Sequence, residues 1–135
     1  MIVGIGVDLV DLARFDRAAT RTPALLERLF TAEETTNGAG RTLPLRSLAG
    51  RFAAKEALIK AVGDSAGMRW HDMRVVSDAL GNPSFAVFGA MAGILERRGV
   101  TELHLSMSHD GGLAIAYVIA EGPSETVPTT GAGRP

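Results

Sequence analysis

Short apolar stretches and amphipathic stretches alternate along this chain, and turn residues separate them. Residues 2–7 are apolar and rich in β-branched side chains, which predicts a strand. Because successive side chains of a strand point to opposite faces, Gly4, Gly6 and Asp8 share one face, and aliphatic side chains occupy the other. A face with two glycines allows another element to pack closely against it. Asp8 projects from this bare face near the end of the strand.

Helical patterns follow over residues 11–19, 22–30 and 31–34, and Thr31 with Glu34 matches a capping box for the short third helix. Asp11 is a suitable N-cap for the first helix, which leaves Asp8 free for another role. The first helix also carries a basic side, which consists of Arg14, Arg17 and Arg21. Such a run is usually a solvated surface.

A longer helix is predicted over residues 50–63, with Ser47 as its N-cap and Gly63 as the glycine that ends it. Apolar side chains fall on one side of this helix at helical spacing: Leu48, Phe52, Ile59 and Val62. Lys55 lies in the middle of this apolar arc. The simplest interpretation is that its methylenes cover the core while its ammonium reaches water.

The next face of the same helix carries Glu56 and Lys60 between small residues, and two interpretations stay open. The first is a surface pair one helical turn apart, which contributes about 0.2–0.5 kcal/mol. The second is a metal ligand among phosphate-binding cations. Arg51 and Lys55 are like charges one turn apart, and a bound anion would relieve their repulsion.

The second half of the chain predicts a hairpin, a helix and two further strands, over residues 70–77, 84–88, 90–98, 103–108 and 113–120. Ser106 and Ser108 lie on the polar face of the fourth segment, and a turn is expected at residues 109–112. The last strand is apolar on both faces, so we expect it to be central or covered on both sides. The element order predicts the α+β class, with a mostly antiparallel sheet packed against helices.

Composition narrows the classes of protein that this chain can represent. Its 135 residues, 46% of them apolar, fit one domain, which we place at residues 1–121. Residues 122–135 are rich in Pro, Gly, Ser and Thr and predict a disordered C-terminal tail. The net charge of −1 argues against a general nucleic-acid binder, and the absence of cysteine excludes disulfides and thiolate metal sites.

Targeting signals do not appear in the sequence. Apolar runs stay shorter than the roughly 18–20 residues that a membrane span needs. Residues 1–8 lack the basic region that begins a signal peptide. We therefore expect a cytoplasmic protein that binds no membrane.

Two carboxylates from different elements, Asp8 and Glu56, are the main chemical candidates. Mg²⁺ prefers a few carboxylates together with water and phosphate oxygens, so these two residues predict a magnesium site. Lys60 and Arg51 are expected to hold phosphates beside it. His109 directly follows the alternating Ser106 and Ser108, which favours a second phosphate contact.

A serine hydrolase is a poor fit to this chain. Ser108, His109 and Asp110 are adjacent in sequence, and adjacent side chains on a strand or turn point apart. Neither a G-x-S-x-G elbow nor a P-loop is present.

Five motifs, in order over residues 1–121, resemble those of the holo-acyl-carrier-protein synthases, the small single-domain type of 4′-phosphopantetheinyl transferase. They are Gly4-Ile5-Gly6-Val7-Asp8, Phe30-Thr31-Ala32-Glu33-Glu34, Arg51-Phe52-Ala53-Ala54-Lys55-Glu56-Ala57 with Lys60-Ala61-Val62-Gly63, Gly81-Asn82-Pro83, and Ser106-Met107-Ser108-His109. Any one of these motifs is weak, and the five together are specific. The resemblance implies a 4′-phosphopantetheinyl transferase-like fold and a homotrimer with active sites between subunits.

The resemblance also implies a reaction in support of fatty acid biosynthesis. Coenzyme A donates its 4′-phosphopantetheine to a serine of apo acyl carrier protein, and 3′,5′-ADP leaves, with Mg²⁺ required. Asp8 and Glu56 would ligate the metal, and Glu56 and Lys60 would be catalytic. The contacts to coenzyme A would come from Arg46, Arg51, Lys60, Gly63, Gly81, Pro83, Ser106 and His109. Arg14, Arg17 and Arg21 would dock the acidic carrier protein.

The identity of the general base stays open among Glu56, a metal-bound water and Asp110. Two other functions remain possible from the residues alone. One is a different Mg²⁺-dependent phosphate enzyme, such as a phosphatase or nuclease. The other is a non-catalytic α+β binding module, in which Asp8 and Glu56 only cap and pair.

Overall fold

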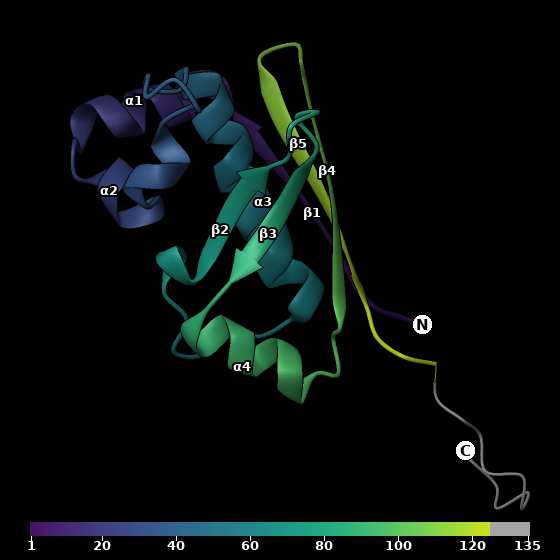
Figure 1. Ribbon diagram of the computed structural model, residues 1–135. Helices are drawn as coiled ribbons and strands as arrows, with labels where there is room; N and C mark the ends of the chain where they lie inside the picture. The colour runs from purple at the N-terminus through teal and green to yellow at the C-terminus, as the bar shows by residue number, and fades with distance from the viewer. Residues whose placement is uncertain (125–135) are drawn as a thin grey trace, which may run out of the picture.

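The computed structural model describes residues 1–124, which form a three-stranded sheet, a two-stranded hairpin and the helices around them (Figure 1). The strands are β1 (Ile2–Asp11), β2 (Met73–Ser77), β3 (Pro83–Val87), β4 (Glu102–Asp110) and β5 (Leu113–Glu121). The helices are α1 (Leu12–Arg21), α2 (Leu25–Leu29), α3 (Leu45–Val62) and α4 (Gly89–Arg97), with two 3₁₀ turns, η1 (Ala32–Thr35) and η2 (Trp70–Asp72). All strand pairs are antiparallel. The α+β class predicted from the sequence is confirmed.

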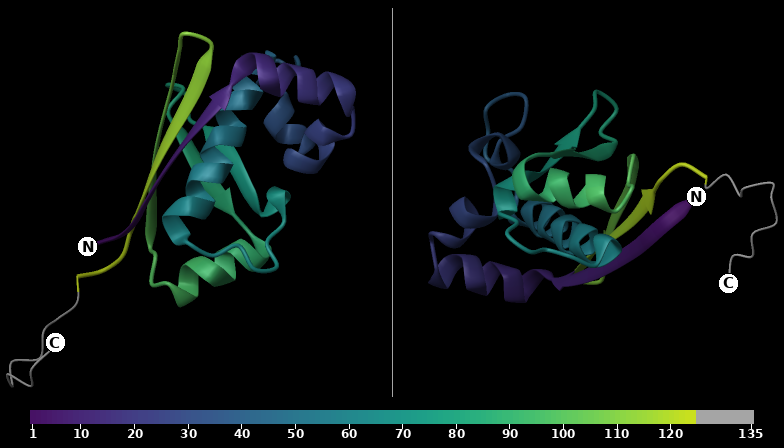
Figure 2. Two further views of the ribbon diagram at one scale, coloured as in Figure 1. Left: turned by 180° about the vertical axis from the view of Figure 1, so that it is seen from behind. Right: turned by 90° about the horizontal axis from the view of Figure 1, so that it is seen from below.

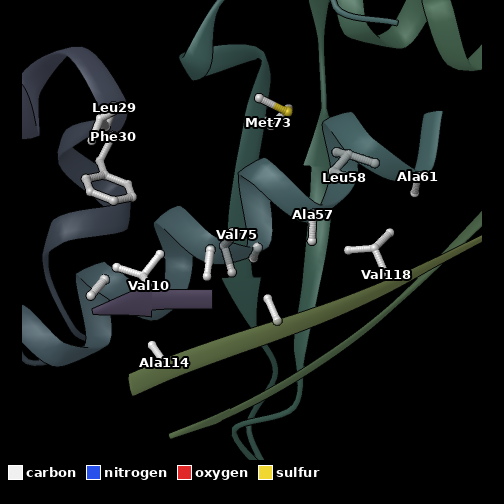
Figure 3. Packing of buried hydrophobic residues seen from close by; sticks show 14 of the residues in the cluster. Val10, Leu29, Phe30, Ala57, Leu58, Ala61, Met73, Val75, Ala114 and Val118 are labelled. Atoms are coloured by element: carbon white, nitrogen blue, oxygen red, sulfur yellow. The ribbon is translucent and has the colours of Figure 1, made fainter. Parts of the chain in front are cut away.

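Helix α3 lies at the centre of the molecule, between the three-stranded sheet and the β2–β3 hairpin (Figure 2). It is buried on most sides, which explains why its apolar residues are not confined to one arc. Figure 3 shows buried side chains of β5 and β2, with Val118 and Val75 among them, around this helix. Gly63 ends the helix in the left-handed conformation, with φ of 74°, as predicted.

The start of α3 differs from the prediction. The helix begins at Leu45 rather than after Ser47, and the Ser47 amide donates to the carbonyl of Pro44 at 2.9 Å. Pro44 is the N-cap, with φ of −58° and ψ of 150°, and its carbonyl accepts the first hydrogen bonds of the helix. Ser47 therefore lies inside the first turn and does not cap the helix.

The two glycines of β1 let this strand lie directly against α3. A Cβ atom added to Gly4 would be 1.8 Å from the carbonyl oxygen of Ala61, and one added to Gly6 would be 1.8 Å from that of Ala57. The close approach predicted for this bare face is confirmed. It brings Asp8, on the same face, over the carboxyl-terminal half of α3.

The sheet order is β1-β5-β4, so β5 is the central strand, as expected from its apolar sequence. Its inward face, which includes Ala116 and Val118, is buried against α3. Its other face is open, and Tyr117 is 46% exposed. In register beside Tyr117 lie Val7 of β1 and Ser106 of β4. Of the two alternatives expected from the sequence, the central position is confirmed, and within residues 1–124 one chain covers only the inward face of β5.

Other predicted boundaries also move. Strand β1 continues to Asp11 rather than ending at residue 7, and strand β2 begins at Met73 because residues 70–72 form η2. Strand β4 extends to Asp110, so His109 belongs to the strand, and the turn is confined to Gly111 and Gly112, both with positive φ. Helix α2 spans Leu25–Leu29, which is shorter than the predicted 22–30. The capping box of Thr31 and Glu34 is present at η1, as predicted.

The predicted tail falls mostly outside the described residues, since residues 125–135 are not among them. Its first residue, Gly122, is tied to the start of the chain. The Gly122 amide donates to the Met1 carbonyl at 2.9 Å, and the Met1 ammonium donates to the Gly122 carbonyl at 2.7 Å. The single domain and its tail stay predictions.

Candidate active site

A cleft of about 510 Å³, which we call the carboxylate cleft, opens where β1, α1, α2 and α3 meet. Asp8 from the end of β1 and Glu56 from α3 both line it, so the structure brings the two predicted metal ligands to one place. Asp11 caps α1 by accepting from the Arg14 amide at 2.9 Å, which confirms its predicted role. Asp8 is thereby left to face the cleft.

Lys60 pairs with Asp8 and not simply with the glutamate one turn before it. Its ammonium is 3.0 Å from the Asp8 carboxylate and 3.1 Å from the Val7 carbonyl. The interpretation of Glu56 and Lys60 as a local surface pair is therefore incomplete, because Lys60 crosses from α3 to β1.

Burial and the neighbouring Asp8 carboxylate raise the pKa of Glu56, whereas the Lys60 ammonium lowers it. A buried carboxylate whose pKa is raised by a second carboxylate beside it is a natural ligand for a cation. Their oxygens, with room for water in an open cleft, match the ligands that Mg²⁺ prefers. The donor set of this chain thus fits the magnesium that the sequence predicts.

A second group of metal-type side chains lies elsewhere. His104 Nε2 is 3.0 Å from a carboxylate oxygen of Glu121 and 3.7 Å from one of Glu102. These residues lie near the far end of the sheet, and His104 projects from the exposed face rather than toward α3. They take no part in the carboxylate cleft.

An aromatic wall lines the carboxylate cleft, and the sequence analysis assigns it no role at the site. The ring centroids of Phe15 and Phe52 are 5.6 Å apart, and those of Phe52 and Trp70 are 5.7 Å apart. Leu25 and Leu29 of α2 complete this wall. The apolar wall and the two carboxylates make a site that is charged on one side and apolar on the other.

A second cleft of about 260 Å³, which we call the basic cleft, lies between the start of α3, the β2–β3 hairpin and the end of β4. It unites five of the residues predicted to contact coenzyme A: Arg46, Arg51, Gly81, Pro83 and His109. Gly81 is in the hairpin turn with φ of 83°, a conformation that favours glycine. Ser47, Gly50 and Met107 also line this cleft, although the sequence assigns them no role there.

The remaining predicted contacts to coenzyme A lie outside the basic cleft. Ser106 is on the exposed face of the sheet opposite Tyr117, Gly63 is at the far end of α3, and Lys60 is beside Asp8. Ser108, two residues later in β4, does line the basic cleft. The roles of Ser106 and Gly63 stay predictions.

Arg51 is half-buried at the wall of the basic cleft. Its Nη1 donates to the Val75 carbonyl at 2.6 Å. Burial lowers the pKa of Arg51, and the Glu34 carboxylate raises it. A guanidinium with several donors retains capacity for a phosphate after one bond to a carbonyl.

Lys55 corrects the prediction of a side chain that reaches water. It is 0% exposed, and its ammonium is 2.9 Å from Glu34, which is also buried. Burial lowers the pKa of Lys55, and Glu34 opposes this change. The negative charge that offsets the Arg51 and Lys55 repulsion is therefore supplied by the protein itself.

The basic side of α1 is only partly at the site. Arg14 lines the carboxylate cleft, whereas Arg17 and Arg21 lie farther along the helix surface beside Asp16 and Thr20. All three arginines are exposed. This arrangement gives a positive surface that leads to the cleft.

Residues 4–118 match the sequence profile of the 4′-phosphopantetheinyl transferase superfamily. The chain belongs to this superfamily. It is 62% identical over 122 residues to a holo-[acyl-carrier-protein] synthase of Clavibacter sepedonicus, a match that covers 90% of this chain and 98% of the relative. It is 50% identical over 121 residues to one of Salinispora arenicola, covering 90% of this chain and 99% of that one.

Solved structures of the 4′-phosphopantetheinyl transferase superfamily agree with the fold. A holo-[acyl-carrier-protein] synthase of Neisseria meningitidis superposes with a TM-score of 0.76 at 36% identity, covering 90% of this chain and 99% of that one. One of Helicobacter pylori, solved in complex with coenzyme A, gives 0.74 at 28% identity, covering 87% and 99%. The family, the fold and the enzyme class predicted from the motifs are confirmed: this phosphopantetheinyl transferase is of the holo-acyl-carrier-protein synthase type. In the described part of this transferase, the helices lack the length and apolar character needed to cross a bilayer.

Proposed function

We propose that this chain transfers 4′-phosphopantetheine from coenzyme A to a serine of apo acyl carrier protein at a Mg²⁺ site made by Asp8 and Glu56. The observation that carries the metal assignment is the convergence of Asp8 from β1 and Glu56 from α3 at one cleft, with Lys60 in contact with Asp8. We further propose that the enzyme acts in the cytoplasm, as the sequence leads us to expect.

Each residue at the carboxylate cleft has a proposed task. When bound, Mg²⁺ would neutralise pyrophosphate charge and fix its orientation. Lys60 would stabilise the phosphate that is attacked, since phosphoryl-type transfer depends mainly on positioning and charge neutralisation. Glu56 would accept the proton of the serine, and its raised pKa suits a general base better than an ordinary carboxylate would. Asp110 lies at the exposed end of β4 and is the alternative base.

We assign the nucleotide end of coenzyme A to the basic cleft. Arg46, Arg51 and His109 would contact the phosphate groups of coenzyme A. The hairpin turn at Gly81 and Pro83 would lie beside its adenine ring. The basic side of α1, led by Arg14, would receive the acidic carrier protein next to the carboxylate cleft.

The proposed assembly is a homotrimer with active sites between subunits. Two features of the chain support it. The carboxylate and basic clefts have separate linings within one chain. The outer face of the sheet leaves large apolar side chains exposed, including Ile5, Leu9 and Tyr117. A closed ring joins two different surfaces of each subunit, which would bring the carboxylate cleft of one chain to the basic cleft of the next.

The reaction is tested by intact mass spectrometry of an apo carrier protein after incubation with the enzyme, coenzyme A and Mg²⁺. A mass increase of one phosphopantetheine group is expected, and it should depend on both coenzyme A and the metal. Simple hydrolysis of phosphate esters, with the carrier protein unchanged, would instead indicate a phosphatase.

The shared site is tested by mixing two inactive variants, Glu56→Gln and His109→Ala, after dissociation and reassembly. If the two clefts of one site come from neighbouring chains, some mixed interfaces carry both lesions and others carry neither, so activity returns. If both clefts serve the same site within one chain, every site keeps one lesion. Mixed trimers that stay inactive would rule out the shared site.

A further inference from the structure

Glu34 and Lys55 form a fully buried ion pair between η1 and α3. Their exposed fractions are 2% and 0%, and neither residue lines the carboxylate cleft or the basic cleft. The ammonium of Lys55 also lies 4.9 Å from the centroid of the Phe30 ring. The pair is therefore shielded from solvent and is placed away from the proposed ligands.

All three donors of the Lys55 ammonium have partners. Besides Glu34 at 2.9 Å, it donates to the carbonyls of Leu29 at 2.5 Å and Trp70 at 3.2 Å. Leu29 and Trp70 both belong to the apolar wall of the carboxylate cleft. Lys55 thus fixes two backbone points of that wall to helix α3, one residue before Glu56.

The Glu34 carboxylate extends the same network to the basic cleft. One oxygen accepts from the Thr31 amide at 3.0 Å and from Lys55, and the other accepts from the Val75 amide at 3.0 Å. Val75 lines the basic cleft, and its carbonyl accepts from Arg51. Both backbone polar groups of Val75 are therefore held by side chains rather than by a neighbouring strand.

Stability alone is a weak reason for such a pair. Removing two charges from water is costly, and apolar side chains of similar size often replace buried ion pairs with little loss. What apolar side chains do not supply is a set of directed bonds to backbone groups. In this chain, these bonds run from one pair to the walls of both clefts.

We propose that Lys55 and Glu34 are positioning residues of the transferase, which set the walls of both clefts relative to α3 without touching substrate. The inference rests on the proposed assignment of ligands to the two clefts. It predicts that weakening this pair changes ligand binding at both clefts, although each cleft keeps all of its own lining side chains.

The main test uses the double variant Glu34→Gln/Lys55→Met, because it removes both charges of the buried pair together and is expected to fold. Glutamine at position 34 offers one acceptor oxygen in place of two, so it cannot serve both Thr31 and Val75. Methionine at position 55 releases the two carbonyls. We expect the KM for the carrier protein and the Kd for 3′,5′-ADP, measured by calorimetry without turnover, each to rise about tenfold, since small misplacements are costly for binding and catalysis.

Leu58→Ala is the matched control for a purely structural loss. Leu58 is a fully buried residue of α3 that lines neither cleft, and its truncation should lower the free energy of unfolding by about 2–5 kcal/mol. At a temperature where this variant is folded, its KM for the carrier protein and its Kd for 3′,5′-ADP should equal those of the unmodified enzyme.

A double variant that loses thermal stability but binds both ligands as the unmodified enzyme does would overturn the proposal. His109→Ala separates this result from a wrong ligand assignment. If His109→Ala weakens 3′,5′-ADP binding and the double variant does not, only the positioning role is wrong. If His109→Ala also leaves binding unchanged, the assignment of the basic cleft is wrong, and the positioning inference falls with it.

Discussion

Lys60 on helix α3 donates to Asp8 on strand β1 at 3.0 Å, so the proposed phosphate-binding cation and the proposed metal ligand are already in contact. The Lys60 side chain is 54% exposed and that of Asp8 is 16% exposed. An ion pair this open to solvent contributes no more than about 1 kcal/mol to stability. Its position is better explained by the chemistry of the cleft than by folding.

The first prediction concerns the rate of transfer. Glu56→Gln and Lys60→Ala should each lower kcat/KM by roughly 10²-fold or more, because each removes a contact that stabilises the transition state. Their far-ultraviolet circular dichroism should match that of the unmodified enzyme. Glu96→Gln, on the exposed surface of α4, is the control and should leave the rate unchanged. Near-normal turnover in both site variants would defeat the assignment.

The second prediction concerns pH and metal. The pKa of Glu56 is raised in the folded chain above the ordinary value of 4.5. Well below 4.5 the group is protonated in both states and has no effect. As pH rises above 4.5, the unfolded chain ionises before the folded chain does, and the free energy of unfolding falls until pH has passed the raised pKa. Glu56 therefore lowers stability at neutral pH.

A bound divalent cation would offset this penalty. Mg²⁺ should therefore raise Tm more at pH 7 than at pH 5, as measured by differential scanning fluorimetry. Glu56→Gln should raise the Tm of the metal-free protein at pH 7 and reduce the effect of Mg²⁺. An equal Mg²⁺ effect in this variant and in the unmodified protein would place the metal elsewhere.

The third prediction concerns the contact between β1 and α3. Gly6→Ala should lower the free energy of unfolding by about 3 kcal/mol or more, because the new Cβ has no room beside the Ala57 carbonyl. The same substitution at Gly38 meets no atom within 4 Å and should change stability by less than about 1 kcal/mol. Equal Tm values for the two variants would show that β1 moves away from the helix without difficulty.

The fourth prediction concerns assembly. Tyr117→Arg places a charge in the middle of the open sheet face and should convert the proposed trimer to a monomer, as measured by sedimentation velocity. Activity should fall together with the mass, since the proposed sites are shared. Glu96→Arg is the matched control on a surface outside the sheet. A fully active monomer would contradict the shared site.

Local sequence patterns predict the elements that their own residues determine. Gly63 ends α3, Asp11 caps α1, and the two glycines of β1 permit its contact with the helix, each for a reason visible within a few residues. The sequence also predicts that Asp8 and Glu56 lie at one site, because each lies beside small residues on a face that must pack against another element.

Contacts that join distant parts of the chain are a different matter. The spacing of Thr31 and Glu34 predicts a capping box, which is present. The Glu34 carboxylate of this box also accepts a hydrogen bond from Lys55, 21 residues away. A pattern read along the chain assigns the carboxylate to its local role and leaves Lys55 without a buried partner. The wrong interpretation of Lys55 follows directly from this limit.

The aromatic wall was missed for a related reason. Phe15 and Phe52 fit the periodicity of core residues, and periodicity does not distinguish a packed interior from the wall of a cleft. The predicted start of α3 is too late because Ser47 has the side chain of a typical N-cap. In the structure Pro44 is the N-cap, and the helix begins at Leu45.

The two side chains that hold Val75 also have a protective effect. Strand β2 pairs only with β3, so its other side is a sheet edge, and an open edge is a template for pairing with other chains. Glu34 occupies the amide and Arg51 occupies the carbonyl of Val75, in the middle of that edge. Residues placed to shape a substrate cleft therefore also guard the hairpin against intermolecular β-aggregation.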